Sequence, residues 1–128
     1  MDIPIISKIE KKSAVDMIDE IAFVSGGLMI ARGDLGVECG VEKVPLMQRK
    51  IIDAADKYAR PTIIATQMLE SMTDYPRPTM AEINDVASGV LEGAGALMLS
   101  GEVASGKHPV KSVTVSYTHL TLPTILLV

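Results

Sequence analysis

The sequence predicts an α/β fold built on parallel strands. Four short, continuous apolar segments lie at residues 3–9, 27–31, 61–66 and 95–100, and segments with helical periodicity separate them. Continuous apolar strands are typical of a parallel sheet that is covered on both faces, whereas alternating strands are typical of a sheet with one exposed face. The predicted order is therefore strand, helix, strand, helix, strand, helix, strand.

Three predicted helices connect these strands, and in each of them apolar residues recur three or four positions apart. The first has Ser13 as its predicted N-cap. The second runs from about residue 41 to residue 58. The third spans residues 79–91, begins with a Thr79 and Glu82 capping signal, and ends before Gly93.

The spacing of the strands fits consecutive βα units. The predicted strand centres, at Ile5, Leu28, Ile63 and Leu97, are 23, 35 and 34 residues apart. Right-handed crossovers of this length place successive strands side by side in parallel. Both a doubly wound sheet and part of a β/α barrel fit this order. A complete eightfold barrel is excluded, because it needs about 250 residues and the chain has 128.

Polar residues gather where each predicted strand ends. They are Ser7, Lys8 and Glu10, then Arg32, Gly33 and Asp34, then Thr66 and Gln67, and finally Ser100 and Glu102. Because β/α proteins build their sites at the carboxyl ends of strands, contributions from every strand favour a barrel mouth over a single crevice. Side chains two positions apart on a strand point the same way, so we expect Lys8 to face one pocket with Glu10, and Ser100 to share a direction with Glu102.

These residue types suggest phosphate and metal chemistry. Glu10 and Asp34 could share one hard divalent cation through oxygen ligands. Lys8 adds a positive charge that suits a phosphoryl group in transfer. The glycines of residues 32–36 let backbone N–H groups approach an anion. The simpler alternative stays open: Lys8 and Glu10 form an ordinary solvated ion pair, and residues 32–36 form an ordinary turn.

Composition excludes several classes of protein. Twelve Lys and Arg against sixteen Asp and Glu give a net charge of −4, which is unlike the basic surface of a nucleic-acid-binding domain. No segment reaches the roughly 18 unbroken apolar residues of a membrane helix, and the first residues lack the pattern of a secretory signal. The single cysteine, Cys39, rules out an internal disulfide. We therefore expect a cytoplasmic protein with neither a nucleic-acid nor a membrane partner.

Six sequence strings resemble the pyruvate kinase family. They are SKIE at 7–10, MIARGDLGVE at 29–38, EKVPLMQRKII at 42–52, ATQMLESM at 65–72, PRPTMAE at 76–82 and LMLSGE at 97–102. They occur in the order and spacing of that family over about residues 3–114. The resemblance implies that residues 1–114 form the last four βα units, with parallel strands, of a TIM (β/α)8 barrel, the C-terminal half of the family's catalytic barrel domain.

The resemblance also implies a function. The family transfers a phosphoryl group from phosphoenolpyruvate to ADP, giving pyruvate and ATP in glycolysis, with Mg²⁺ or Mn²⁺ and K⁺. The family's K⁺ ligands have no counterpart in this chain. The parent enzyme is expected to be a homotetramer, and the chain alone is expected to be inactive. Two alternatives stay open: a metal-dependent aldolase or lyase on a related barrel, and a non-catalytic half-barrel that self-associates.

Residue roles follow from the same resemblance. Lys8 is similar to the lysine that stabilises the migrating phosphoryl group and contacts the substrate. Glu10 and Asp34 are similar to the metal ligands. Thr66 is similar to the residue that handles the enolate, where it both contacts the substrate and serves catalysis.

The remaining roles concern the substrate carboxylate and the proton path. Backbone amides around Ala31, Gly33 and Asp34 resemble those that hold the substrate carboxylate in the family. Ser100 and Glu102 resemble catalytic residues of the proton path.

Residues 115–128 differ from the rest of the chain. The string VSYTHLTLPTILLV contains no Asp, Glu, Lys or Arg, and it resembles the translation of a sequencing adapter. We therefore expect a non-native tail over residues 115–128. The alternative is a genuine apolar strand.

Overall fold

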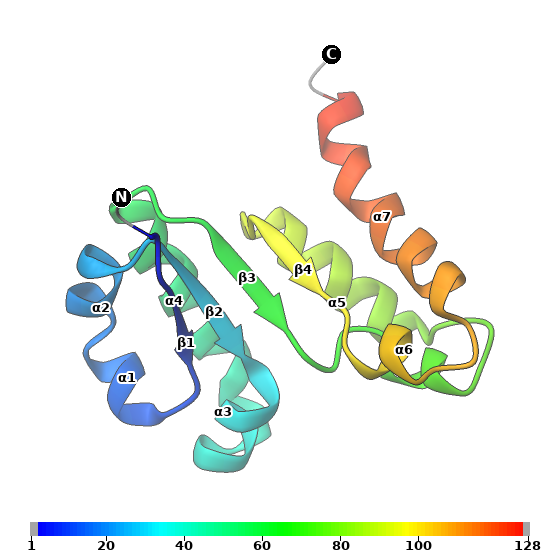
Figure 1. Ribbon diagram of the computed structural model, residues 1–128, viewed down its shortest axis with the longest axis horizontal. Helices are drawn as coiled ribbons and strands as arrows, with labels where there is room; N and C mark the ends of the chain where they lie inside the picture. The colour runs from blue at the N-terminus through cyan, green and yellow to red at the C-terminus, as the bar shows by residue number, and fades with distance from the viewer. Residues whose placement is uncertain (1–2, 127–128) are drawn as a thin grey trace.

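The computed structural model describes residues 3–126 (Figure 1). Its sheet contains four strands in the spatial order β1-β2-β3-β4, and all neighbouring pairs are parallel. The strands are β1 (Ile6–Ile9), β2 (Gly27–Ala31), β3 (Thr62–Ala65) and β4 (Ala96–Met98). The predicted α/β class, the strand order and the parallel direction are confirmed.

The register of the sheet places all four carboxyl ends at one edge. Ile9 at the end of β1 pairs with Ile30 of β2. Ala65 at the end of β3 lies opposite Ala31 and Met98, the last residues of β2 and β4. Residues that directly follow the strands therefore lie along a common edge.

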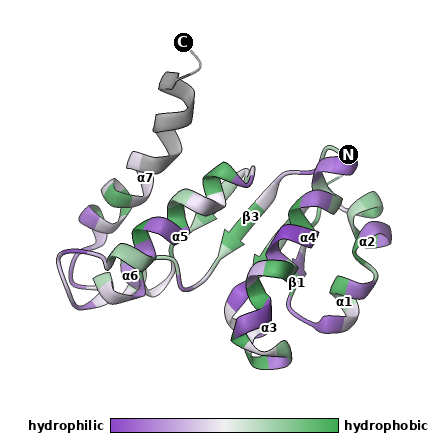
Figure 2. Cartoon of the chain, turned by 180° about the vertical axis from the view of Figure 1, so that it is seen from behind, coloured by the Kyte–Doolittle hydropathy of each residue, from purple (hydrophilic) through white to green (hydrophobic). Residues whose placement is uncertain are grey.

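Helices connect and follow the strands. The helices in the described part of the chain are α1 (Lys12–Asp16), α2 (Ile18–Val24), α3 (Arg32–Cys39), α4 (Val44–Lys57), α5 (Met80–Leu91), α6 (Gly101–Ala104) and α7 (Pro109–Leu126), with short 3₁₀ turns η1 (Val41–Lys43) and η2 (Glu70–Thr73). In Figure 1, α4 and α5 lie behind the strands, and Figure 2 shows hydrophilic and hydrophobic residues mixed along both helices. Over residues 3–126, no helix is both long enough and apolar enough to cross a bilayer.

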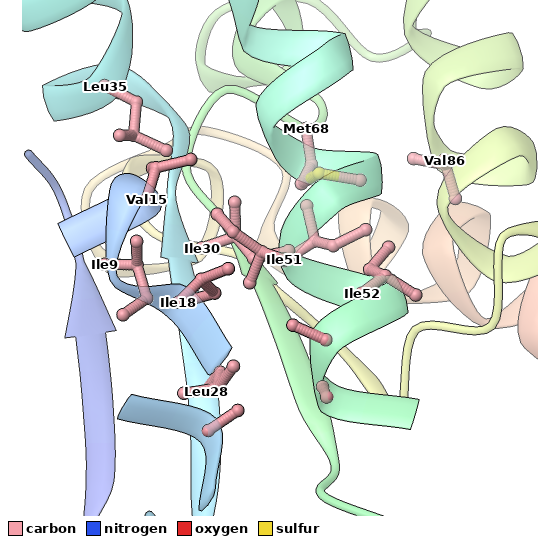
Figure 3. Packing of buried hydrophobic residues seen from close by; sticks show 14 of the residues in the cluster. Ile9, Val15, Ile18, Leu28, Ile30, Leu35, Ile51, Ile52, Met68 and Val86 are labelled. Atoms are coloured by element: carbon pink, nitrogen blue, oxygen red, sulfur yellow. The ribbon is translucent and has the colours of Figure 1, made fainter. Parts of the chain in front are cut away.

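The core lies between the sheet and α4. Ile51 and Ile52 of α4 are fully buried, as are Leu28 and Ile30 of β2 (Figure 3). Ile64 of β3 is also fully buried. Each such side chain contributes about 1.5–3 kcal/mol through removal of its apolar surface from water. This aliphatic layer packs α4 against β2, and Ile64 of β3 lies next to Gly89 of α5.

The edge strands are less covered than the sequence predicted. Ile5 is 70% exposed and Ile6 is 50% exposed, and every residue of β4 is only half-buried. The prediction of strands covered on both faces is therefore wrong for β1, because Ile6 and Lys8 on one face are exposed while Ile9 on the other face is buried. Continuous apolar sequence alone does not reveal which strands stand at an edge.

The connection between β1 and β2 also differs from the prediction. Helix α1 begins at Lys12, its N-cap position is Lys11, and no side chain caps it. Ser13 lies inside the first turn, where its carbonyl oxygen accepts a hydrogen bond from the N–H of Met17. The chain departs from helical geometry at Met17, between α1 and α2. The prediction of Ser13 as the N-cap is therefore wrong.

The segment after β2 is a helix rather than a simple turn. Helix α3 starts at Arg32, directly after the last strand residue, and ends before Gly40, whose φ of +95° is readily adopted only by glycine. The second predicted helix is confirmed as η1 followed by α4, with Pro45 in the first turn of α4. The third is confirmed as α5.

The start of α5 is held by a capping box. The Thr79 hydroxyl accepts a hydrogen bond from the N–H of Glu82, whose carboxylate accepts one from the N–H of Thr79. The same carboxylate accepts hydrogen bonds from the backbone and hydroxyl of Ser71. Partial burial tends to raise the pKa of Glu82, but these hydrogen bonds outweigh burial and lower the pKa. Gly93, at φ +98°, follows the end of α5 as predicted.

The described part of the predicted tail, residues 115–126, continues helix α7. The alternative of an apolar strand there is wrong. The origin of residues 115–128 stays a prediction, and residues 127–128 lie outside the described part.

Replacement of Thr79 by alanine tests the capping box. We expect Thr79→Ala to lower the free energy of unfolding by about 1 kcal/mol, because the N–H of Glu82 loses its acceptor. Urea denaturation of the 128-residue chain measures the change. Ser13→Ala is the matched control and is expected to stay within about 0.5 kcal/mol of wild type. Equal losses in the two variants would contradict the observed helix starts.

Candidate active site

A lysine and two carboxylates meet at the carboxyl ends of β1 and β2. The Nζ atom of Lys8 lies 2.5 Å from Oε2 of Glu10 and 3.0 Å from Oδ2 of Asp34. The three side chains are 53%, 40% and 55% exposed, in that order. The predicted approach of Lys8, Glu10 and Asp34 is therefore observed, and solvent can reach all three groups.

The sheet explains why residues 26 positions apart come together. Lys8 lies on β1 and Glu10 directly follows that strand. Asp34 lies in the first turn of α3, which starts directly after β2. Since β1 pairs in parallel with β2, the carboxyl ends of both strands lie at the same edge of the sheet.

The two carboxylates change the protonation of Lys8. Hydrogen bonds to Glu10 and then to Asp34 raise the pKa of Lys8 above its ordinary value of 10.5. Both bonds favour the charged ammonium, and they outweigh desolvation, which acts in the opposite direction. Lys8 is therefore a fixed positive charge at neutral pH rather than a proton-transfer group.

The same pair of carboxylates fits a divalent cation. The ammonium of Lys8 lies between one oxygen of Glu10 and one oxygen of Asp34, so both carboxylates converge on a position that favours positive charge. Carboxylate oxygens are the donors that Mg²⁺ and Mn²⁺ take, and two protein carboxylates with water and substrate complete a typical Mg²⁺ shell. A hollow of about 260 Å³ next to both residues is also lined by Lys11, Val37 and Glu38.

No larger metal cluster accompanies this pair. Among the residues that the structure describes, no group of three or more His, Cys, Asp or Glu side chains could hold a metal. Any cation at Glu10 and Asp34 therefore depends on further oxygen donors that these residues do not supply.

The first turn of α3 joins this cluster to β3. The N–H of Gly33 donates a hydrogen bond of 2.9 Å to Oγ1 of Thr66. A Cβ atom at Gly33 would lie only 3.3 Å from that oxygen, so the close approach favours glycine. The predicted amides of Ala31, Gly33 and Asp34 thus surround the start of a helix, where N–H groups favour anions.

Ser100 and Glu102 are arranged differently from the expectation. Strand β4 ends at Met98, and Glu102 lies in α6, so the two side chains do not alternate along one strand. Glu102 is 1% exposed and accepts hydrogen bonds from the N–H groups of Leu69 and Ser100, at 3.1 and 2.7 Å. The Ser100 hydroxyl is buried and has no hydrogen-bond partner among the described residues. Glu102 is therefore an anchor for two loops, and Ser100 carries the free polar group.

Sequence reasoning named Arg32 at the end of its strand but gave it no role, and it did not consider Asp85. The structure buries Arg32 to 7% exposure and pairs it with Asp85 at 2.7 Å. An arginine directly after a buried apolar strand was the available signal. Its partner lies 53 residues further along the chain, and no local spacing links the two.

The parallel sheet carries a lysine, two carboxylates, helix N-terminal amides and hydroxyl groups along its carboxyl edge. This arrangement is typical of β/α proteins, which place their ligand sites at that edge. A family model described as the pyruvate kinase barrel domain matches residues 1–113. The chain belongs to the pyruvate kinase family, as the resemblance predicted.

Individual relatives agree with the family match. The chain is 51% identical over 114 residues to a pyruvate kinase of Thermotoga maritima. The matched segment covers 89% of this chain and 24% of that protein. It is 53% identical over 112 residues to one of Borreliella burgdorferi, with coverage of 88% and 24%, and 54% identical over 112 residues to one of Bacillus licheniformis, with coverage of 88% and 19%. The chain thus spans about a quarter or less of the length of these relatives.

Titration of Lys8 tests the electrostatic arrangement. We expect its pKa to lie above 10.5, and Glu10→Gln to lower it more than Asp34→Asn does, because the hydrogen bond to Glu10 is the largest cause of the shift. The raised value means that Lys8 stabilises the fold below the unfolded pKa of about 10.4 and that this contribution is lost as the pH rises through the folded value.

The chemical shift of the lysine Cε carbon against pH measures this titration. Lys12 is the internal control, since its pKa is raised by Asp16 instead. Glu10→Gln should leave the Lys12 titration unchanged, and an equal shift of both lysines would refute a specific Lys8 cluster.

Proposed function

We propose that this chain forms the last four βα units of the barrel of a pyruvate kinase and takes part in phosphoryl transfer from phosphoenolpyruvate to ADP, giving pyruvate and ATP. The observation that carries the proposal is the convergence of Lys8, Glu10 and Asp34 at the carboxyl edge of a parallel sheet. Membership of the family adds the reaction.

The partial barrel is supported by the shape of the sheet. The observed helices pack against one side, while Ile6 on β1 remains half-exposed. A barrel built from four more βα units would cover that side and close both sheet edges. The homotetramer, the K⁺ requirement and the cytoplasmic location remain expectations from the family.

Phosphoryl transfer requires positioning and charge neutralisation more than covalent chemistry. The permanent charge of Lys8 suits a transferring phosphoryl group, whose equatorial oxygens carry negative charge. Glu10 and Asp34 would hold Mg²⁺ or Mn²⁺. A bound divalent cation would supply further neutralisation of the phosphoryl charge.

The product of transfer is an enolate that needs a proton on carbon. The amides at the start of α3, around Ala31, Gly33 and Asp34, suit the substrate carboxylate, because helix N-terminal N–H groups favour anions. The Thr66 hydroxyl lies directly beside them and can deliver or relay a proton. The buried hydroxyl of Ser100 could take part in the next proton transfer. Glu102 holds the backbone of Ser100 in place.

A chimera tests this function. Residues 1–113 of this chain replace the matched segment of the Thermotoga maritima enzyme. We expect the chimera to form ATP from phosphoenolpyruvate and ADP, and Lys8→Met to lower kcat by at least about 100-fold, as for the loss of a group that stabilises transition-state charge. A coupled assay of pyruvate formation measures both.

The matched control is Lys12→Met, which removes an exposed lysine that is paired with Asp16 rather than with Glu10. It should leave kcat within about twofold, as an exposed ion pair contributes little. The isolated 128-residue chain is expected to show no turnover. A folded but inactive chimera, or a chimera insensitive to Lys8→Met, would reject the proposal. An enolate-forming lyase would yield no ATP in the same assay.

The metal role of the carboxylates has its own test. In the chimera, we expect Glu10→Gln and Asp34→Asn each to raise the Mg²⁺ concentration for half-maximal activity by at least about tenfold, because each removes a charged oxygen donor. Glu38→Gln is the control, since Glu38 lines the same hollow, while the ion pairs of Lys8 within the described residues are with Glu10 and Asp34. A Mg²⁺ titration in which all three variants respond alike would contradict direct ligation.

A further inference from the structure

The chain holds two consecutive residues in the left-handed region at the end of β3. Thr66 has a φ of +70° and Gln67 has a φ of +56°. Neither is a glycine, and a β-branched threonine in this region is a true outlier. Such a conformation persists only where the surroundings hold it in place, and it occurs preferentially at functional sites.

Arg32 holds both residues through their carbonyl groups. Its Nε and Nη2 atoms donate hydrogen bonds of 3.2 and 2.9 Å to the carbonyl oxygen of Thr66, and Nη2 also donates one of 2.9 Å to that of Gln67. One planar guanidinium therefore fixes two successive peptide groups. A lysine ammonium could not reproduce this fork of donors.

Asp85 fixes the guanidinium from the other side. Nη1 of Arg32 lies 2.7 Å from Oδ1 of Asp85, and the two side chains are 8% and 35% exposed. A buried charge needs such a partner, and a guanidinium held at three nitrogens has little freedom to turn. Helix α5, which carries Asp85, is thus tied through Arg32 to the end of β3.

The first turn of α3, which begins with Arg32, also orients the hydroxyl of Thr66. The residue after Arg32 is Gly33, whose N–H donates to Oγ1 of Thr66 at 2.9 Å. Two neighbouring residues therefore set the backbone and the side chain of Thr66 together. We propose that Arg32, supported by Asp85, is a positioning residue that holds Thr66 and Gln67 in the left-handed conformation and so directs the Thr66 hydroxyl to the substrate site.

The inference rests on the proposed function only for its kinetic consequence. In the chimera, we expect Arg32→Lys to lower kcat by at least about tenfold while the KM for phosphoenolpyruvate changes less than about threefold. The reason is that the Thr66 hydroxyl would no longer be held in its orientation, while Lys8, Glu10 and Asp34 stay in place. Hydrogen–deuterium exchange should become faster over residues 66–69 and remain unchanged in α4.

Substitution at Gln67 separates positioning from general damage. Gln67→Gly removes the penalty of the left-handed conformation, whereas Gln67→Ala removes the same side chain and keeps the penalty. In the Arg32→Lys background, we expect Gln67→Gly to restore kcat at least about threefold and Gln67→Ala to restore none. Equal recovery by the two substitutions, or normal exchange over residues 66–69 in Arg32→Lys, would overturn the inference.

Two further outcomes are decisive. If Arg32→Lys does not fold, Gln67→Gly and Gln67→Ala are compared in the Asp85→Asn background instead. We expect a smaller loss of kcat there, because the guanidinium keeps its carbonyl acceptors. If the wild-type chimera folds without turnover, the proposed function fails, and exchange over residues 66–69 still decides whether Arg32 holds the segment.

Discussion

Parallel pairing of the four strands is the constraint on which the site depends. The register of β1, β2, β3 and β4 brings their carboxyl ends to one edge, so residues separated by 26 or more positions become neighbours. The aliphatic layer between α4 and β2 maintains this register, because a slip along β2 would expose Leu28 and Ile30. The charged groups at the edge contribute little to that stability, since Lys8 and its partners are about half exposed.

Buried and exposed charges have different tasks in this molecule. Lys8, Glu10 and Asp34 face solvent, where their contacts with one another can be exchanged for contacts with a ligand. Arg32 and Glu102 are buried, and each is satisfied mainly by backbone groups of other loops. Breaking a buried set leaves an unpaired charge, which is costly, so these residues hold fixed positions. Under the proposed function, the exposed set contacts the ligand, and the buried set fixes the loops around it.

Sequence patterns predicted most of the fold, for reasons of local physics. The apolar runs and the Thr79 capping signal depend on neighbouring residues, and both the strands and α5 formed as expected. The approach of Lys8 to Asp34 followed from topology. Sequence could not show that Glu102 turns inward or that Arg32 meets Asp85, because these contacts depend on how distant loops pack. The sequence also did not predict a helix beginning at Arg32, because Gly33 and Gly36 are equally compatible with a turn.

The single carboxylate of Glu102 has a consequence for evolution and for redesign of this edge. This carboxylate accepts hydrogen bonds from the N–H of Leu69 after β3 and from the N–H of Ser100 after β4, so it links the two loops. A backbone shift in either loop would disturb a hydrogen bond of the same carboxylate, so the two loops are not independent in redesign. Variation is easier at Val37, which lines the hollow beside Glu10 and Asp34 and is 91% exposed.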